Sequence, residues 1–191
     1  MIDYLILLSI PCLVALIVTP LLRQTAIRSN ALDYPNENKI HKNALPRLGG
    51  IAIVISFIFS MGIGYSFLNI DHNGKTESLA GLCIGASIIA LVGIWDDIRS
   101  LNASKKFIGQ IAAVLATIPF GFIISEINVP LVGIVYVGNV LGTVLAIFWV
   151  VGIINTINFI DGVDGLAGSI TISIRAALFT ISIFSGQAQM R

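Results

Sequence analysis

Four polar side chains recur at three-residue intervals in one stretch of the sequence, NTINFIDGVDGLAG. They are Asn155, Asn158, Asp161 and Asp164. Side chains three residues apart lie on the same side of a helix, so their oxygen atoms can face a common ligand. The glycines between and after the two aspartates allow a ligand to approach the backbone and its N–H groups closely. In a chain that is otherwise mostly apolar, such a group of polar residues indicates a functional site.

A second carboxylate pair, Asp96 and Asp97, directly follows Trp95. Two adjacent carboxylates repel each other, so a cation close to them is expected. Mg²⁺ takes oxygen ligands and usually binds through one or two carboxylates together with the phosphates of a substrate. The alternative is that the pair merely ends a helix and faces water, which is the simpler interpretation for the pair taken alone.

Basic residues occur in two further places. His41, Lys42 and Arg47 belong to the stretch HKNALPRLGG, and Lys105 and Lys106 follow Asp96 and Asp97. Their charge suits a diphosphate, to which lysine contributes a compact point charge. Lys and Arg beside a membrane span also act as anchors on the cytosolic side, and a single loop histidine is often only solvated. Taken one at a time, these residues fit either interpretation.

The elements that must position these residues are membrane helices by composition. Of the 191 residues, 56% are hydrophobic and 11% are charged, and the mean hydropathy is +0.94. An ordinary soluble domain carries about 25% charged residues, whereas a helix that crosses roughly 30 Å of hydrocarbon needs about 20 apolar residues. The sequence therefore predicts an all-α polytopic bundle of about six transmembrane helices, near Tyr4–Leu22, Leu48–Leu68, Leu79–Trp95, Phe107–Ile124, Val140–Ile157 and Ile170–Phe184.

The distribution of basic residues predicts the orientation of these spans. Cytosolic loops are enriched in Lys and Arg. Such residues crowd between the first and second spans and between the third and fourth, whereas the loops on the other side contain only Lys75. We therefore expect the N-terminus to lie outside the cell and the three polar stretches to lie on the cytosolic face. Because topology accounts for the basic residues, the net charge of +1 gives no indication of nucleic-acid binding.

Three stretches of the chain together resemble one family of bacterial membrane enzymes. HKNALPRLGG, GIWDDIRSLNASKKFIGQ and NTINFIDGVDGLAGS are similar, in order and separation, to motifs of the polyprenyl-phosphate N-acetylhexosamine-1-phosphate transferases, bacterial glycosyltransferase family 4. The resemblance implies a multi-pass enzyme of the bacterial cytoplasmic (inner) membrane with a cytosolic active site, and it leaves a homo-oligomer open. It further implies Mg²⁺ or Mn²⁺ as cofactor. The implied reaction transfers N-acetylhexosamine-1-phosphate, with GlcNAc-1-phosphate as the expected group, from a UDP-sugar to undecaprenyl phosphate and starts cell-envelope glycan synthesis.

The resemblance also implies a role for each matching residue. Asp96 and Asp97 match the catalytic pair, which would orient or deprotonate the lipid phosphate. Since the second pKa of a phosphate monoester is about 6, we favour positioning over proton removal. The implied substrate-binding residues are His41, Lys42, Lys106, Asn155, Asp161 and Asp164, and the implied metal ligands are Asn158 and Asp161.

The chain departs from the family in two ways. Ser104 occupies a position where relatives often have the first lysine of a Lys-x-Lys pair, although Lys105 is adjacent. The chain also ends at Arg191, before the Gly-Asp-x-Gly-Ser motif and the later loop rich in His or Arg that members carry. We therefore expect residues 1–191 to form a single transmembrane catalytic domain that is truncated at its C-terminus. By itself, such a chain is expected to form no lipid-linked product.

Other functional classes make different predictions from the same residues. A transporter would carry its polar residues near the middle of the membrane, whereas here they gather at one face. A CDP-alcohol phosphotransferase would show Ala-Arg shortly after its Asp-Gly and further acidic residues downstream, a series that does not follow Asp161. The main alternative is an inactive, truncated membrane fragment of the same family that keeps the inherited motifs.

The predicted topology can be tested by cysteine labelling in intact cells. Single cysteines at Asn38 and Ser100 should resist a membrane-impermeant thiol reagent, because both positions are expected on the cytosolic side. A cysteine at Asn73 should be labelled. All three should react once the cells are permeabilised, and labelling at Asn38 in sealed cells would contradict the predicted orientation.

Overall fold

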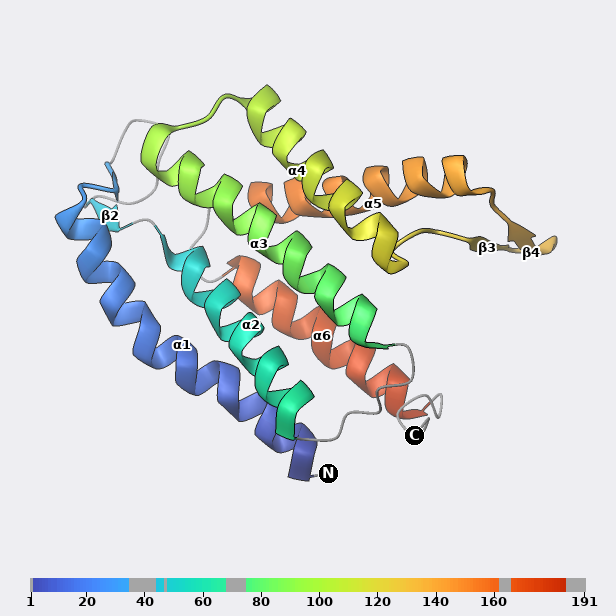
Figure 1. The fold of residues 1–191 in the computed structure, drawn as a ribbon, viewed down its shortest axis with the longest axis horizontal. Helices are drawn as coiled ribbons and strands as arrows, with labels where there is room; N and C mark the ends of the chain where they lie inside the picture. The colour runs from blue at the N-terminus through green and yellow to red at the C-terminus, as the bar shows by residue number, and fades with distance from the viewer. Residues whose placement is uncertain (1, 35–43, 47, 68–74, 162–165, 185–191) are drawn as a thin grey trace.

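The computed structural model describes residues 2–34, 44–46, 48–67, 75–161 and 166–184. Six α-helices dominate these ranges, and Figure 1 shows their arrangement. Their bounds are α1 Ile2–Arg28, α2 Gly49–Phe67, α3 Lys75–Arg99, α4 Ala103–Thr117, α5 Asn139–Ile160 and α6 Leu166–Phe184. The all-α architecture expected from the composition is confirmed.

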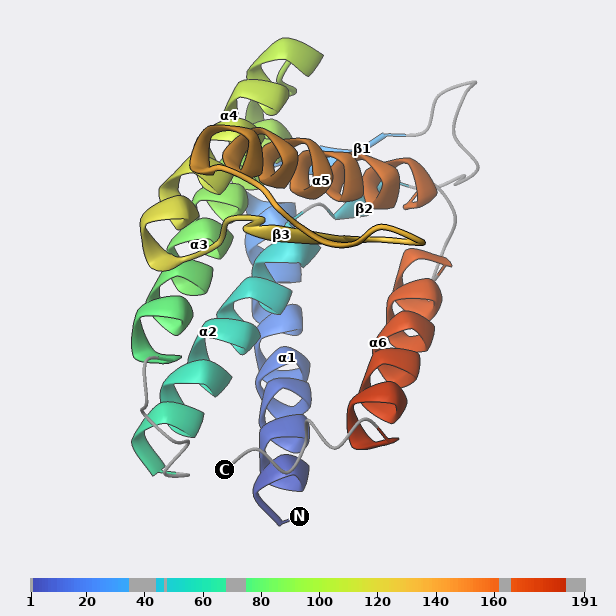
Figure 2. The ribbon, with the colours of Figure 1, turned by 90° about the vertical axis from the view of Figure 1, so that its right-hand side faces the viewer.

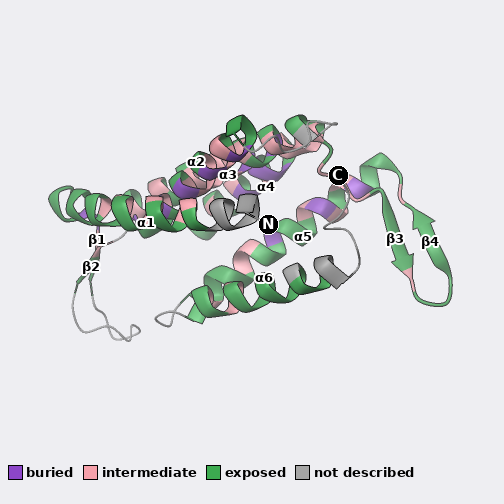
Figure 3. Cartoon of the chain, turned by 90° about the horizontal axis from the view of Figure 1, so that it is seen from below, coloured by how far each residue is buried: buried purple, intermediate pink, exposed green. Residues whose placement is uncertain are grey.

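Two short antiparallel ladders connect the helices. β1 (Leu32–Asp33) pairs with β2 (Leu45–Pro46) next to the end of α1. β3 (Glu126–Val129) and β4 (Gly133–Tyr136) form a hairpin between α4 and α5, and Gly133 adopts φ +93°, which glycine accepts without strain. The hairpin projects beyond the helices in Figures 1 and 3.

Within the described ranges, four helices are long and apolar enough to cross a membrane. The qualifying stretches in α1, α2, α3 and α5 are Ser9–Arg28, Gly49–Phe67, Thr76–Arg99 and Asn139–Ile160. With its 15 residues α4 is shorter, about 22 Å against roughly 30 Å of hydrocarbon. In α6 the apolar stretch is Leu166–Leu178. The chain is thus a membrane protein, and the total of six spans stays a prediction.

The fourth expected span, Phe107–Ile124, does not continue as one helix. α4 ends at Thr117, a 3₁₀ turn covers Ile118–Phe120, and Gly121 follows in the left-handed region at φ +89°. Pro119 lies in the first turn of the 3₁₀ helix, where its missing N–H is tolerated, whereas in the interior of a longer α-helix it would remove a hydrogen bond. The apolar composition therefore extends past the residues at which proline and glycine stop the helix.

α1 and α2 lie side by side (Figures 1 and 2). The buried residues of α2 are Ala52, Ser56, Ser60 and Gly64, one at every fourth position. Small residues on one face let two helix backbones approach closely within a membrane. Both serine hydroxyls donate to a carbonyl oxygen four residues earlier, at 2.6 and 2.7 Å, so their burial leaves neither hydroxyl unpaired.

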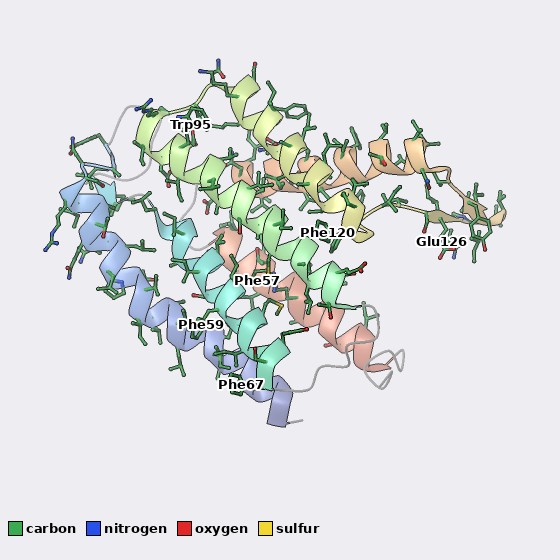
Figure 4. The ribbon with its side chains drawn as sticks, viewed as in Figure 1. Phe57, Phe59, Phe67, Trp95, Phe120 and Glu126 are labelled. Atoms are coloured by element: carbon green, nitrogen blue, oxygen red, sulfur yellow. The ribbon has the colours of Figure 1, made fainter. Side chains whose placement is uncertain are left out.

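Large apolar side chains lie mostly on the outer surface of the helices, which Figure 3 shows as extensive exposed area. Phe59 and Phe67 of α2, labelled in Figure 4, are 54% and 78% exposed. In a soluble protein such residues are usually buried. Helices that are apolar all round are typical of membrane spans, whose outer faces contact lipid.

Glycines allow close packing of α4 against α3, and of α5 against the segment that leads to the hairpin. A Cβ at Gly109 of α4 would lie 2.6 Å from the Val92 side chain of α3. A Cβ at Gly142 of α5 would overlap the backbone carbonyl oxygen of Ile124, in the segment that leads to the hairpin. A backbone oxygen cannot swing aside as the end of a flexible side chain can, so Gly142 is the less tolerant position.

We therefore expect Gly142→Ala to destabilise the protein by about 1–3 kcal/mol through overpacking. The matched control is Gly152→Ala in the same helix, where a Cβ meets nothing within 4 Å. This control should keep or slightly raise stability, because alanine is the better helix former. Thermal unfolding midpoints in detergent would measure both variants, and equal midpoints would contradict the described contact between α5 and Ile124.

Candidate functional site

The Asp96 carboxylate joins the end of α3 to the start of α4. The Leu101 N–H donates to Asp96 Oδ1 at 2.9 Å, and Lys106 Nζ lies 2.7 Å from Asp96 Oδ2. Asn102 caps α4, because its Oδ1 accepts from the Lys105 N–H at 3.0 Å. Together these contacts fix a tight turn that brings the first turn of α4 back onto the end of α3.

The Lys106–Asp96 ion pair is only partly exposed, with side-chain exposures of 35% and 29%. Ion pairs near the surface contribute about 0–1 kcal/mol, so this pair adds little to stability. The main effect of the pair is to fix the positions of the two side chains. One cation and one carboxylate are held side by side, and both remain accessible to a ligand.

The neighbouring Asp97 contacts a distant part of the chain. The Leu48 N–H donates to Asp97 Oδ2 at 3.0 Å, across 49 positions of sequence. Leu48 has φ +74°, which is unfavourable for a residue with a Cβ. Its side chain is buried and packs with Ala26 and Ala31. Asp97 therefore fixes the segment that leads into α2 against the end of α3.

Two amide side chains join α4 to α5. Asn155 Nδ2 donates to Gln110 Oε1 at 2.7 Å and to the Val151 carbonyl oxygen of its own helix at 2.8 Å. Gln110 is buried, with 7% exposure, and Asn155 is partly buried. Gln110 follows Lys106 by four positions, so both lie on the same side of α4. We call Lys106 and Gln110 the polar face of α4.

Two of the remaining predicted residues, Asn158 and Asp161, lie at the end of α5. Asn158 is exposed one helical turn after Asn155, and the exposed Asp161 is the C-cap residue, whose N–H donates to the Ile157 carbonyl oxygen at 3.0 Å. The other three candidates lie outside the described residues, so the roles expected of them stay predictions. They are His41, Lys42 and Asp164.

These contacts connect the three polar stretches of the sequence. The Asp97–Leu48 hydrogen bond attaches the first stretch to the second, and the Gln110–Asn155 hydrogen bond attaches the second to the third. In Figure 1, the C-terminal ends of α1 and α3 and the N-terminal ends of α2 and α4 lie toward the same end of the molecule. The arrangement can hold a ligand with several charged and polar groups.

Sequence reasoning missed Leu48 and Gln110 as parts of this arrangement. Leu48 takes part through its backbone N–H, which no side-chain pattern reveals. Gln110 offered a signal, because it is a polar residue at the start of the apolar stretch GQIAAVLA and lies one turn after Lys106.

Comparison with known proteins identifies the family. The family model described as glycosyl transferase family 4 matches residues 79–191. A probable undecaprenyl-phosphate N-acetylglucosaminyl 1-phosphate transferase of Bacillus subtilis is 30% identical over 98% of this chain and 50% of its own length. A decaprenyl-phosphate N-acetylglucosaminephosphotransferase of Mycolicibacterium smegmatis is 31% identical over 84% of this chain and 40% of its own.

An undecaprenyl-phosphate alpha-N-acetylglucosaminyl 1-phosphate transferase of Salmonella typhimurium is 29% identical over 89% of this chain and 44% of its own length. The chain thus spans about half the length of the curated relatives it matches. The matched region contains the polar face of α4 together with both of its partners, Asp96 and Asn155. Because the family model covers more than half of the sequence, the chain belongs to glycosyl transferase family 4.

Proposed function

We propose that this chain provides the nucleotide-sugar and lipid-phosphate site of an N-acetylglucosamine-1-phosphate transferase. The reaction moves N-acetylglucosamine-1-phosphate from UDP-N-acetylglucosamine to undecaprenyl phosphate, releases UMP and starts the synthesis of a cell-envelope glycan. The observation that carries the proposal is the connection of the three polar stretches through the Asp97–Leu48 and Gln110–Asn155 hydrogen bonds. The activities named for the relatives support the choice of lipid and sugar.

This reaction brings two phosphate groups together. An oxygen of the lipid phosphate attacks the β-phosphorus of the nucleotide-sugar, and the bond from that phosphorus to the bridging oxygen breaks as UMP leaves. Negative charge accumulates on the phosphate oxygens, so cations that are positioned in advance lower the barrier. Lys106, held 2.7 Å from Asp96, is such a cation.

The two adjacent aspartates have different tasks in this proposal. Asp96 holds the Lys106 ammonium group in place, and a bound phosphate would contact the same ammonium group. Asp97 binds the Leu48 N–H and keeps the segment entering α2 close to the end of α3. Since a phosphate monoester has its second pKa at about 6, neither aspartate needs to remove a proton at neutral pH.

The end of α5 offers donors that fit a divalent cation. Asn158 and Asp161 present exposed side-chain oxygens there, and Mg²⁺ and Mn²⁺ favour oxygen ligands. Among the residues that the structure describes, no three His, Cys, Asp or Glu side chains are grouped for a metal, so phosphate oxygens and water would complete the coordination. A bound Mg²⁺ would supply charge neutralisation for the diphosphate.

The proposed location is the bacterial cytoplasmic membrane, with the site on the cytosolic side. The basic residues around the first two polar stretches support this orientation. Trp95, 54% exposed and labelled in Figure 4 near the end of α3, is a residue type that favours the membrane interface. Glu126 of the hairpin lies at the far end of the molecule in the same view.

Nucleotide-sugar binding is the first test. The purified chain in detergent should bind UDP-N-acetylglucosamine more tightly with Mg²⁺ than with EDTA, since the cation links protein oxygens to the diphosphate. Asp161→Ala should weaken the binding with Mg²⁺ by about tenfold, as expected for the loss of one charged contact. Isothermal titration calorimetry measures all of these affinities.

The control for Asp161→Ala is Glu126→Ala, which removes an exposed carboxylate from the hairpin. This variant should bind like the unmodified chain. Equal affinity with Mg²⁺, with EDTA and for Asp161→Ala would contradict a metal-dependent nucleotide site at the end of α5.

Turnover is the second test. Because the chain spans half of its Bacillus subtilis relative, the assay uses the chain joined to the remaining half of that relative. Membranes with UDP-N-acetylglucosamine and undecaprenyl phosphate should form lipid-linked product. Asp96→Asn should lower the rate by about 10²–10³-fold, while Glu77→Gln in the first turn of α3 should have no effect. An unchanged rate in Asp96→Asn would exclude this carboxylate from the reaction, and absence of product from the joined protein would favour an inactive fragment.

A further inference from the structure

Gln110 is a buried polar side chain with an unusual partner. Among the described residues, the buried polar side chains are Ser56, Ser60 and Gln110. The two serines bond to carbonyl groups of their own helix, whereas Gln110 of α4 reaches Asn155 of α5. Burial of an amide between membrane helices is costly unless it is hydrogen-bonded, and polar groups kept in such places commonly serve function.

The second partner of Asn155 fixes which way both amides point. The Val151 carbonyl oxygen can only accept, so the Asn155 atom 2.8 Å from it must be the NH₂ nitrogen. The same nitrogen lies 2.7 Å from the Gln110 side chain, which must therefore present its oxygen. If either amide turned over, two groups of the same kind would face each other. The network itself thus determines the orientation.

This orientation decides what Asn155 offers to a ligand. Gln110 and Val151 take both protons of its NH₂ group, so Oδ1 is the polar atom that is left for a ligand, and it can only accept. A phosphate oxygen is also an acceptor and cannot bond to Oδ1. An N–H group of a base or an O–H or N–H group of a sugar can.

The amide pair lies close to the charged part of the site. Lys106 precedes Gln110 by one turn on the polar face of α4, about 6 Å along the helix axis. Asn158 follows Asn155 by one turn toward the end of α5. A nucleotide-sugar whose diphosphate contacts Lys106 can therefore place its base or sugar near Asn155.

We propose that Gln110 is a positioning residue for recognition of the nucleotide-sugar. It holds Asn155 so that Oδ1 accepts a hydrogen bond from an N–H or O–H group of the base or sugar. Gln110 itself does not touch the substrate. This inference rests on the proposed function, because the ligand of Asn155 is taken to be the UDP-sugar of that reaction.

The test compares two substitutions of Gln110 in the 191-residue chain in detergent. Gln110→Met keeps the approximate size and removes the acceptor, and Gln110→Glu keeps an acceptor oxygen. Gln24→Met is the matched control, since Gln24 is exposed on α1. Isothermal titration calorimetry with Mg²⁺ measures the affinities for UDP-N-acetylglucosamine, UDP and inorganic pyrophosphate.

Gln110→Met should weaken UDP-N-acetylglucosamine binding by about tenfold and leave pyrophosphate binding within about twofold, because one substrate hydrogen bond is lost and the phosphate contacts remain. Gln110→Glu should restore the affinity to within about threefold, because its oxygen still accepts from Asn155. Gln24→Met should bind like the unmodified chain.

UDP identifies the donor group. An equal loss of UDP affinity in Gln110→Met assigns the donor to the base or ribose, and a loss confined to UDP-N-acetylglucosamine assigns it to the sugar; both results support the proposal. Unchanged binding, a parallel loss of pyrophosphate affinity, or failure of Gln110→Glu to restore binding would overturn it in favour of a purely structural role. Absence of UDP-N-acetylglucosamine binding by the unmodified chain would contradict the proposed function itself, and this inference with it.

Discussion

The polar face of α4 is the interaction on which the rest of the site depends. One helix carries Lys106 toward Asp96 of α3 and Gln110 toward Asn155 of α5. The Lys106–Asp96 pair is partly exposed, whereas the Gln110 amide is buried and needs a hydrogen-bond partner within the protein. The two contacts therefore set the relative positions of the ends of α3, α4 and α5. Those ends carry the candidate site residues.

The remaining helix packing serves a different purpose. Between membrane helices the apolar side chains gain little from leaving lipid, so close approach of small residues supplies much of the attraction. The stripe from Ala52 to Gly64 in α2 and Gly109 of α4, which faces Val92 of α3, provide such approaches. Contacts of this kind bring helices together tightly, whereas the directional hydrogen bonds determine which side chains meet at the site.

Much of this could be predicted from the sequence. Apolar runs of sufficient length predicted the helices, and the three polar stretches together indicated the family. Helix boundaries were harder to predict from the sequence. The run ending at Ile124 stays apolar after Pro119 and Gly121 have stopped the helix. The hairpin also escaped prediction, since its short strands lie in a stretch without clear alternation of polar and apolar residues.

The candidate site, too, could be predicted only in part from the sequence. The types and spacing of Asp96, Lys106 and Asn155 were visible in the sequence, but the hydrogen-bond partners of Asp97 and Asn155 were not. A side chain that bonds to a backbone N–H, as Asp97 does to Leu48, leaves no mark on the identity of the partner residue. The link from Gln110 to Asn155 joins positions 45 apart, and such a distance is set by how whole helices pack.

The long sequence separation of these two hydrogen bonds has a consequence for biogenesis. A chain is inserted into the membrane from its N-terminus onward, so α1 and α2 can pack together as soon as both are present. The strained backbone at Leu48 gains the Asp97 carboxylate only after α3 has been made, and Gln110 gains Asn155 only after α5 has been made. Until then Gln110 carries an amide without its interhelical partner. The site is therefore completed late, when α3 and α5 supply the partners of Leu48 and Gln110.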